Sequence, residues 1–254
     1  MKNMSEEIKI LPIIGNQSGA KEYWKELLKL GIRAEYHNPE YILVLSGDGG
    51  LLGGERDYYK MNVPIIGIGF GTLNFLLNRN FLTPEKFIIA LRKNQWERLK
   101  MRGIRLYMTL ESGADVNGIA FNEVTIKPMN RTASAYLSAG LIDSGKLYET
   151  KGDGLIVATP QGSSAYSYEA GNIILPLTST KWCLTSIAAR RLAFQERVTR
   201  QEIIVLNKKD NDNLFVVADN KAFENVVELR VVPSKYEVEL LFDPSEVIEE
   251  RRFE

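Results

Sequence analysis

Two glycine-rich turns carry residue types that bind phosphate groups, and each follows a short apolar run. The first is SGDGG at residues 46–50, directly after the run Tyr41–Leu45. Glycines permit positive φ angles and let backbone N–H groups approach a phosphate, and Asp48 is the one ionisable group of the turn. The sequence leaves two alternatives open: a phosphate site, or a plain change of direction with Asp48 capping a helix from Leu51 onward. No GK[ST] follows, so the turn is not a Walker A loop.

The second turn is GIGFGT at residues 67–72, after the apolar run Val63–Ile68. Its spacing is G-x-G-x-G, whereas the dinucleotide fingerprint of the Rossmann fold is G-x-G-x-x-G on the first strand. We therefore predict a tight strand-to-helix turn, with a helix that starts at Thr72 or Leu73.

An amide and a carboxylate stand side by side at Asn122 and Glu123, within the strand-like run Gly118–Ile126. Successive side chains of a strand face opposite ways, so both groups can serve one ligand only near a strand end or a bulge. The alternative is one surface residue beside one buried and satisfied residue.

Residues 151–167 (KGDGLIVATPQGSSAYS) combine an acidic turn, a strand and a hydroxyl-rich Gly-Ser-Ser sequence. Hydroxyl residues cap helix N-termini, and such an N-terminus attracts a phosphate or the edge of a base. This segment is the third candidate for a ligand site.

The first ninety residues alternate strand and helix, as in a doubly wound α/β domain. Continuous apolar runs suit strands buried on both faces of a parallel sheet, and ligands bind at the carboxyl edge of such sheets. Thr83-Pro84-Glu85 supplies an N-cap, a first-turn proline and an acid. We expect strands at 8–14, 41–45 and 63–68, and helices at 18–30 and from 83 onward.

The sequence after residue 96 is typical of antiparallel β structure, because short apolar runs alternate with turn sequences such as ESGAD and KKDNDN. We divide the chain into an α/β domain at 1–98, a mainly antiparallel β domain at 99–242, and a charged tail at 243–254 able to pack back on the first domain. Expected strands are 104–110, 118–126, 133–141, 147–149, 155–159, 202–206, 214–217, 226–232 and 236–242.

The composition excludes several functional classes. The chain has 254 residues with 32 basic and 32 acidic side chains, so no global field steers it toward nucleic acid or an anionic membrane. One cysteine, Cys183, and one histidine, His37, cannot form an internal disulfide or a Cys/His zinc cluster. The N-terminal residues resemble neither a signal peptide nor a membrane span, so we expect a cytoplasmic protein without nucleic-acid or membrane partners.

Taken in order, SGDGG, GFGTLNFL, FNEVTI and KGDGLIVATPQGSSAYSYEAGN resemble the NAD kinase family, whose patterns are GGDG, NTGxLGF, NE and DGLIVATPTGSTAYS. The resemblance covers residues 8 to about 240. It implies an N-terminal α/β domain and a C-terminal all-β domain, with the active site in the cleft between them.

The resemblance also implies roles for individual residues. Asp48 resembles the catalytic aspartate, Asn122 and Glu123 the pair that hydrogen-bonds a ribose, and Asp153 the acid beside the dinucleotide. Further NAD-binding residues implied by the match are Gly49, Phe75, Lys151, Ser164, Ala165, Tyr166 and Ala188, and the phosphate-binding turns are Gly47, Gly49, Gly50, Gly71 and Thr72.

The chain departs from the family patterns at several positions. Asn74 replaces a glycine, Glu169 stands where a small polar residue is common, and Asp219-Asn220 stands where Asp-Gly is usual. Other departures are Ser46, Gly50, Gly69, Phe70, Ser186, Ala189 and Arg190.

The implied reaction moves the terminal phosphoryl group of ATP, or of polyphosphate, to the 2′-hydroxyl of the adenosine ribose of NAD. Mg²⁺ or another divalent cation would enter with the nucleotide, because the sequence has no dedicated metal cage. The resemblance also implies a homodimer or homotetramer.

Three alternatives stay open. A lipid or diacylglycerol kinase shares the glycine turn but lacks the DGLIVATP continuation. An oxidoreductase would need the first-strand fingerprint that GNQSG at residues 15–19 does not supply. A catalytically weak sensor would bind NAD and make no NADP.

Overall fold

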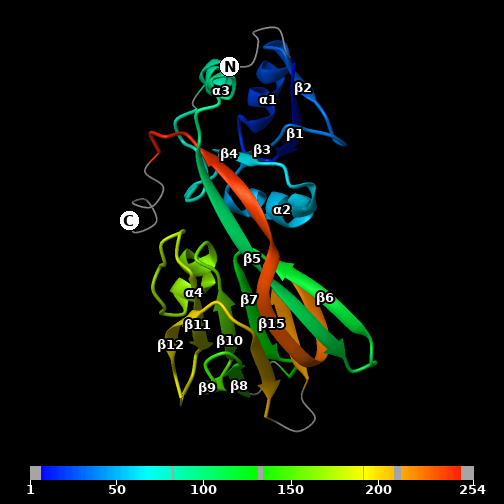
Figure 1. Cartoon of the computed structure of the whole chain (residues 1–254), viewed down its shortest axis with the longest axis vertical. Coiled ribbons are helices and arrows are strands. Elements are labelled where there is room, and N and C mark those ends of the chain that lie inside the picture. The colour runs from blue at the N-terminus through cyan, green and yellow to red at the C-terminus, as the bar shows by residue number, and fades with distance from the viewer. Residues whose placement is uncertain (1–6, 82, 131–133, 191, 209–212, 247–254) are drawn as a thin grey trace. The chain divides into compact units, whose positions relative to one another are not determined.

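The computed structural model describes residues 7–81, 83–130, 134–190, 192–208 and 213–246. The chain forms two units, of which unit 1 contains residues 1–101 and 236–254 and unit 2 contains residues 102–235. The boundaries fall inside two long strands, β5 (Glu97–Leu110) and β15 (Lys221–Phe242), which are labelled in Figure 1.

Unit 1 is built on a parallel sheet. In the order of the sheet its strands are β2 (Ile32–Ala34), β1 (Ile8–Ile14), β3 (Tyr41–Ser46), β4 (Ile65–Gly69) and the last residues of β15. All four neighbouring pairs run parallel, and β3 is buried along its whole length. The apolar runs of the sequence form these strands because a parallel sheet is covered on both faces.

Helices cover both faces of this sheet (Figure 1). Helices α1 (Ala20–Lys29) and α3 (Pro84–Lys93) share a core with Leu43 and Leu45 of β3. Helix α2 (Asp48–Tyr58) packs on the other face, where Gly54 approaches Val44. The doubly wound prediction is confirmed, and so is the cap of α3, because the Thr83 side chain accepts from the N–H of Lys86 at 3.4 Å.

The helix predicted at Thr72 or Leu73 is wrong. After β4 the chain forms bends, and Asn74 has a left-handed φ of 53°. The Asn74 amide accepts from the N–H of Gly71 at 2.9 Å and donates to the Gly71 carbonyl at 2.8 Å. A side chain that satisfies the backbone three residues earlier favours a turn over a helix.

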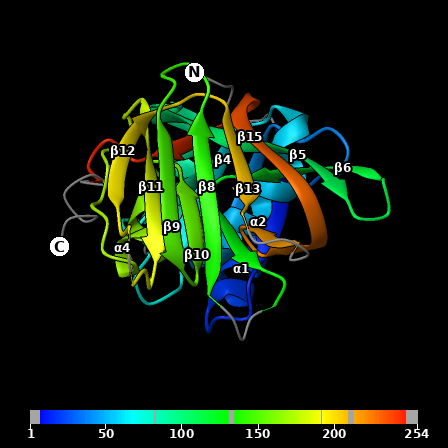
Figure 2. The same ribbon diagram turned by 90° about the horizontal axis from the view of Figure 1, so that it is seen from below.

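Unit 2 is antiparallel β structure (Figure 2). Strands β12, β11, β10, β7, β14 and β15 pair in that order, and β15 continues through β13 and β8 to β9, while β6 pairs with β5. One large apolar core lies on the inner face of these strands. The bounds are β6 Asp115–Ala120, β7 Glu123–Pro128, β8 Ala135–Leu141, β9 Leu147–Gly152, β10 Gly154–Ala158, β11 Lys181–Ile187, β12 Gln195–Thr199, β13 Ile203–Asn207 and β14 Leu214–Ala218.

Several strand predictions need correction in detail. The expected strand 118–126 is two strands, because the chain turns at Phe121-Asn122 between β6 and β7. The strands expected at 226–232 and 236–242 are one strand, β15, since Pro233 does not interrupt it. The short β2 and the strands β11 and β12 were not predicted, and part of the KKDNDN turn lies outside the described residues.

Two short helical turns follow β10, namely η2 (Gly162–Ser164) and α4 (Tyr166–Glu169). A third turn, η1 (Tyr59–Met61), ends α2 in unit 1. Over the described residues, the structure has no helix that meets the length and hydropathy needed to cross a membrane.

The end of β15 and the first tail residues belong to unit 1, whereas our sequence division ended the β domain at residue 242. The physical reason is pairing: Leu240 and Leu241 align with Ile65 and Ile66 of β4. Beyond the strand, the Glu246 carboxylate accepts from the N–H groups of Arg79 and Asn80. Residues 247–254 of the tail lie outside the described part of the chain.

Asn78 links the two chain segments, 1–101 and 236–254, that make up unit 1. Its fully buried side chain donates to the carbonyls of Gly67 at 2.9 Å and Leu241 at 3.0 Å, and accepts from the N–H of Asp243 at 2.7 Å. Loss of this side chain would remove hydrogen bonds from the backbone groups that it contacts, which costs free energy of folding. The Asn78 side chain therefore holds the C-terminal strand on the sheet.

We predict that Asn78→Ala lowers the free energy of unfolding by roughly 2 to 4 kcal/mol, because three backbone groups lose a hydrogen bond to this buried side chain. Urea denaturation followed by far-UV circular dichroism measures this loss. The matched control is Asn80→Ala, since the exposed Asn80 side chain donates only to Ser245 Oγ. Equal losses for the two variants would contradict the assignment.

Candidate functional site

The two glycine turns meet in unit 1. The N–H of Phe70 donates to the carbonyl of Ser46 at 2.7 Å, which joins the chain after β4 to the end of β3. A Cβ on Gly71 would lie 2.8 Å from the Cα of Gly47, so a side chain at residue 71 would overlap the first turn. Both turns follow the carboxyl ends of parallel strands, where ligands bind in open α/β sheets.

Asp48 is the first residue of α2, and its carboxylate joins the two turns. Oδ2 accepts from the N–H of Phe75 at 3.1 Å and Oδ1 accepts from the N–H of Leu76 at 2.9 Å. The helix cap is Gly47, which has no side chain to offer, so the reading of Asp48 as a helix cap is wrong. Asp48 instead holds the segment that contains Phe75, and both residues are half-buried.

The glycine turns offer fewer free N–H groups than their sequence suggests. The N–H of Gly50 donates to the Gly47 carbonyl at 2.9 Å, and that of Gly71 donates to Asn74 Oδ1. A Cβ on Gly50 would lie 2.3 Å from Ser46 Oγ, so this glycine has a packing role. A Cβ on Gly49 would meet nothing within 4 Å, and Thr72 is exposed. Gly49 and Thr72 are therefore open to a ligand.

The sequence did not predict a contact between GNQSG, the turn after β1 at residues 15–19, and the SGDGG turn. Ser46 Oγ donates to Gln17 Oε1 at 3.2 Å, and Gln17 Nε2 lies 3.9 Å from where a Cβ on Gly47 would be. The GNQSG turn thus supplies an amide beside the meeting point of the two glycine turns. The replacement of the usual glycine by Ser46 was the available signal.

Asn122 and Glu123 lie at the start of β7 in unit 2, where the chain has just turned. Asn122 Oδ1 and Glu123 Oε2 are buried atoms without a hydrogen-bond partner. Both groups can serve one ligand only near a strand end, and the pair lies at the start of strand β7. A buried acceptor without a partner is costly unless a ligand completes it.

Burial, with a further contribution from the negative charges of Asp219 and Glu169, raises the pKa of Glu123 to about 8. In the ligand-free protein this carboxyl is therefore mainly protonated at pH 7. A perturbed carboxyl beside an unpaired amide oxygen is the electrostatic signature of a binding site.

The segment after β10 packs directly on this pair. A Cβ on Gly162 would lie 2.3 Å from the Asn122 carbonyl oxygen, so only glycine permits the approach. Ser164 and Ala165 follow, both half-buried, with the N–H of Ala165 donating to the Gly162 carbonyl. The structure thus brings the hydroxyl-rich segment to Asn122.

Tyr166 combines the two roles considered for it. Its ring packs on a small apolar cluster that includes Ile156 and Ile187, as a core residue would. Lys127 Nζ lies 5.7 Å from the ring centroid, and the side chain stays half-buried. One part of the ring is therefore open to a planar ligand.

Lys151, Asp153 and Ala188 form a separate group at the other end of β10. The N–H of Asp153 donates to the Ile187 carbonyl at 2.9 Å, and Lys151 Nζ lies 4.5 Å from the ring centroid of Tyr136. Glu123 pairs with Ala158 whereas Asp153 precedes Gly154, so ~16 Å of chain separates the two groups along the strand. Only an extended ligand could contact both.

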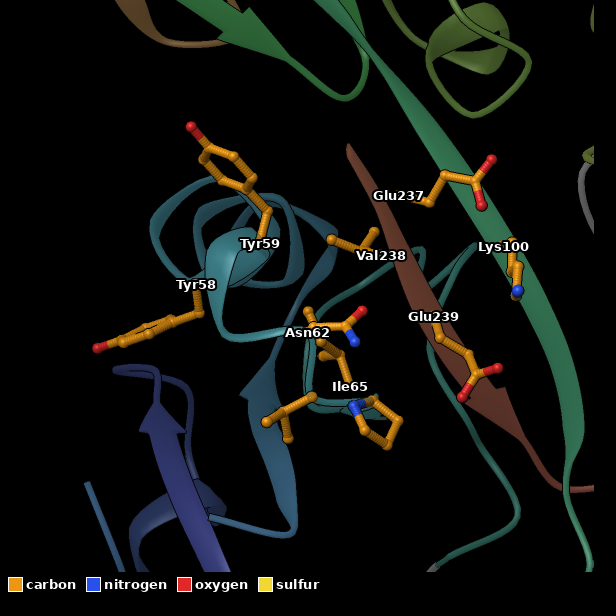
Figure 3. Close-up of a pocket in the computed structure, with 10 residues that line it drawn as sticks. Tyr58, Tyr59, Asn62, Ile65, Lys100, Glu237, Val238 and Glu239 are labelled. Carbon is orange, nitrogen blue, oxygen red and sulfur yellow. The ribbon is translucent and has the colours of Figure 1, made fainter. Parts of the chain in front are cut away.

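A pocket of about 260 Å³ in unit 1 has none of these residues in its lining (Figure 3). It is lined by Tyr58, Tyr59 and Asn62, and by Glu237 and Glu239 of β15, at the amino end of β4. The glycine turns lie at the carboxyl end of that strand. Within the described residues, no group of three or more His, Cys, Asp or Glu side chains could hold a metal ion.

Comparisons with known proteins give one family. The model of the ATP-NAD kinase C-terminal domain matches residues 121–245, which include Asn122, Glu123 and the segment after β10. An NAD kinase of Xanthomonas campestris is 34% identical over 223 residues, covering 85% of each chain. An NAD kinase of Rickettsia peacockii is 32% identical over 254 residues, covering 96% of this chain and 95% of the relative.

Solved structures of the same fold include a yeast NADH kinase complexed with NADH, at a TM-score of 0.81 and 16% identity, covering 98% of this chain and 87% of that one. An NAD kinase from Archaeoglobus fulgidus in complex with ATP has a TM-score of 0.73 and 23% identity, with 98% and 97% covered. These likenesses confirm the fold class, an α/β unit and a β unit. Since relatives above 30% identity align along most of both chains, the chain belongs to the NAD kinase family.

Proposed function

We propose that this chain transfers the terminal phosphoryl group of ATP to the 2′-hydroxyl of the adenosine ribose of NAD, giving NADP and ADP. The ribose oxygen forms the new bond to phosphorus, the bond to the ADP oxygen breaks, and the hydroxyl proton leaves to a base. Unit 2 supplies the groups that hold the nucleoside, and unit 1 supplies the groups that act on the phosphoryl transfer.

The observation that carries this proposal is the pair of buried acceptors, Asn122 Oδ1 and Glu123 Oε2. A ribose presents two neighbouring hydroxyl groups, each able to donate one hydrogen bond. Two adjacent acceptors without partners match such a diol. The raised pKa of Glu123 shows that ionising this carboxyl costs free energy when no ligand is bound.

The rest of the dinucleotide follows β10. Ser164, Ala165 and the open part of the Tyr166 ring bind one base, and Lys151, Asp153 and Ala188 bind the far end of the ligand. The ~16 Å between the two groups suits a dinucleotide better than a single nucleoside.

Asp48 is the base of the reaction. Each of its carboxylate oxygens accepts one backbone N–H and retains a lone pair for a substrate hydroxyl. Phosphoryl transfer depends mainly on positioning and on neutralised phosphate charge, so one fixed carboxylate and the exposed backbone at Gly49 and Thr72 suffice as protein groups. A divalent cation enters as the MgATP substrate and neutralises phosphate charge; polyphosphate is the second donor to test.

An apolar patch in unit 2 supports a homodimer or homotetramer. Leu147 pairs with Gly140 across β9 and β8, and Gly140 pairs with Ile204 of β13, so these residues share one face. Leu147, Leu206 and Ile142 have exposed fractions of 59%, 45% and 52%. Apolar side chains grouped on a sheet face are typical of an interface between chains.

The direct experiment incubates the purified protein with NAD and either MgATP or polyphosphate and measures NADP with an enzymatic cycling assay. NADP formation is expected. Labelled ATP with lipid acceptors tests the lipid kinase alternative. Absence of NADP with both donors, together with retained NAD binding, would favour the sensor.

We predict that Asp48→Asn lowers kcat by roughly 10² to 10⁴-fold, because the amide cannot take the hydroxyl proton. Kinetics at saturating NAD and MgATP measure this. The amide also replaces one acceptor oxygen with a donor that faces the N–H of Phe75 or Leu76, so some stability is lost as well.

The matched control is Asn74→Gly, which removes both hydrogen bonds to Gly71 and allows the left-handed backbone of residue 74. This variant loosens the same segment and keeps the carboxylate. If Asp48 only holds the segment, both variants lose similar activity. A kcat for Asp48→Asn within about threefold of Asn74→Gly would remove the base from the mechanism.

We predict that NAD binds ~10-fold more tightly at pH 9 than at pH 7, because the ribose hydroxyl donates to the ionised Glu123, whose pKa in the free protein is about 8. Isothermal titration calorimetry at both pH values measures the affinities. In Glu123→Gln the affinity should not depend on pH over this range. An equal slope in both proteins would show that Glu123 does not bind through its ionised form.

We predict that the stability of the ligand-free protein falls as the pH rises, which is opposite to the change in NAD affinity. The folded pKa is raised from 4.5 to about 8, so the folded protein binds more protons, and the contribution of Glu123 to stability is lost as pH rises between these values. Thermal melts of the parent should show a steeper loss than melts of Glu123→Gln.

A further inference from the structure

The carboxylate of Asp219 accepts hydrogen bonds from the backbone of Asn122 and Glu123, the two residues proposed to bind the ribose. The sequence suggested no role for Asp219 that would require these contacts. It lies in the turn between β14 and β15, with a left-handed φ of 53°. Its Oδ2 accepts from the N–H of Phe121 at 2.9 Å, and its Oδ1 accepts from the N–H groups of Asn122 at 2.9 Å and Glu123 at 3.2 Å. One carboxylate thus accepts from three successive residues.

The carbonyl groups of the same three residues are also satisfied. Thr159 Oγ1 donates to the Phe121 carbonyl at 2.6 Å, and the N–H of Thr159 donates to the Asn122 carbonyl at 2.8 Å. The N–H of Asp219 donates to the Glu123 carbonyl at 3.0 Å. Two residues, Asp219 and Thr159, therefore satisfy the whole backbone of the segment, and its conformation is set from outside the strand ladder.

This arrangement explains how two neighbouring side chains serve one ligand. In a regular strand Asn122 and Glu123 would face opposite ways. The carboxylate of Asp219 holds Phe121 and Asn122 in a bend before β7 begins, because a negative oxygen attracts N–H groups that a strand would point apart.

We propose that Asp219 is the positioning residue of the ribose site: its carboxylate fixes the backbone at residues 121–123 so that the oxygens of Asn122 and Glu123 meet the same ribose. This inference rests on the proposed function, since it takes the pair as the ribose contact. Asp219 acts on the pair through the backbone, because its two oxygens together accept from the N–H groups of Phe121, Asn122 and Glu123.

The charge of Asp219 has a second effect that provides a specific readout. Asp219 from the β14–β15 turn and Glu169 from α4 are the charged groups that raise the pKa of Glu123, after burial itself. Removing the Asp219 charge should lower that pKa, so the pH midpoint of binding reports whether a variant keeps the charge beside Glu123, and the NAD affinity reports whether it keeps the backbone position.

The experiment measures NAD affinity by calorimetry from pH 6 to 9.5 for the parent protein and for Asp219→Asn. The asparagine keeps one acceptor oxygen but turns an NH₂ group toward the N–H of Phe121. We expect the dissociation constant to rise at least ~10-fold, the usual cost of misplacing a charged hydrogen-bond group, and the pH midpoint of binding to fall below its parent value. The control is Glu202→Gln, which removes a carboxylate paired with Arg230 in the same unit and should change neither quantity.

A second variant, Asp219→Glu, keeps the charge and moves the oxygens by one methylene group. It should weaken NAD binding while the pH midpoint stays near the parent value. This variant tests the proposal even if Asp219→Asn fails to fold, since unchanged affinity in Asp219→Glu would overturn the positioning role.

Asn122→Ala separates this proposal from the proposed function. If Asn122→Ala weakens NAD binding and the folded Asp219 variants do not, the ribose site stands and Asp219 is not its positioning residue. If neither Asn122→Ala nor the Asp219 variants change the affinity, the assignment of the ribose site fails and the inference fails with it. A lower melting temperature for Asp219→Asn with unchanged affinity and pH midpoint would also overturn the positioning role.

Discussion

Carboxylates that accept backbone N–H groups hold the irregular segments of both units. Asp48 accepts from Phe75 and Leu76, Asp219 accepts from residues 121–123, and Glu246 accepts from Arg79 and Asn80. None of these segments has a strand or helix partner for those N–H groups. A charged acceptor is a strong substitute for a missing ladder bond, so the geometry of the candidate site depends on Asp48 and Asp219, and that of the C-terminal segment on Glu246.

This way of building a site has an electrostatic cost. The Asp219 carboxylate that fixes the backbone of Asn122 and Glu123 also repels the Glu123 carboxylate, and burial and Glu169 act in the same direction. The ligand-free site thus holds a mainly protonated carboxyl, whose ionisation is costly, beside an amide oxygen without a partner. In the proposed ribose site, ligand hydroxyl groups would relieve both costs, which would link nucleotide binding to the release of a proton.

The sequence was informative wherever a local pattern had one physical meaning. Continuous apolar runs gave β1, β3 and β4, and Thr83-Pro84-Glu85 gave the start of α3. It failed where a side chain reaches a distant backbone. The helix expected at Thr72 is replaced by the Asn74 turn, and no local pattern in 118–126 shows that Asp219, almost a hundred residues later, divides this run into two strands.

By itself the sequence determined the family, the order of α/β and β structure, and the residue types available for phosphate and ribose contacts, because these depend on composition, periodicity and ordered motifs. Only the tertiary structure decided what those residues contact. It joined Asp48 to the segment after β4, occupied the N–H groups of Gly50 and Gly71, and placed Asp219 beneath Asn122 and Glu123. The physical reason is that a hydrogen bond between residues far apart in the chain leaves no trace in local spacing, and burial, which sets the protonation of Glu123, exists only in the folded chain.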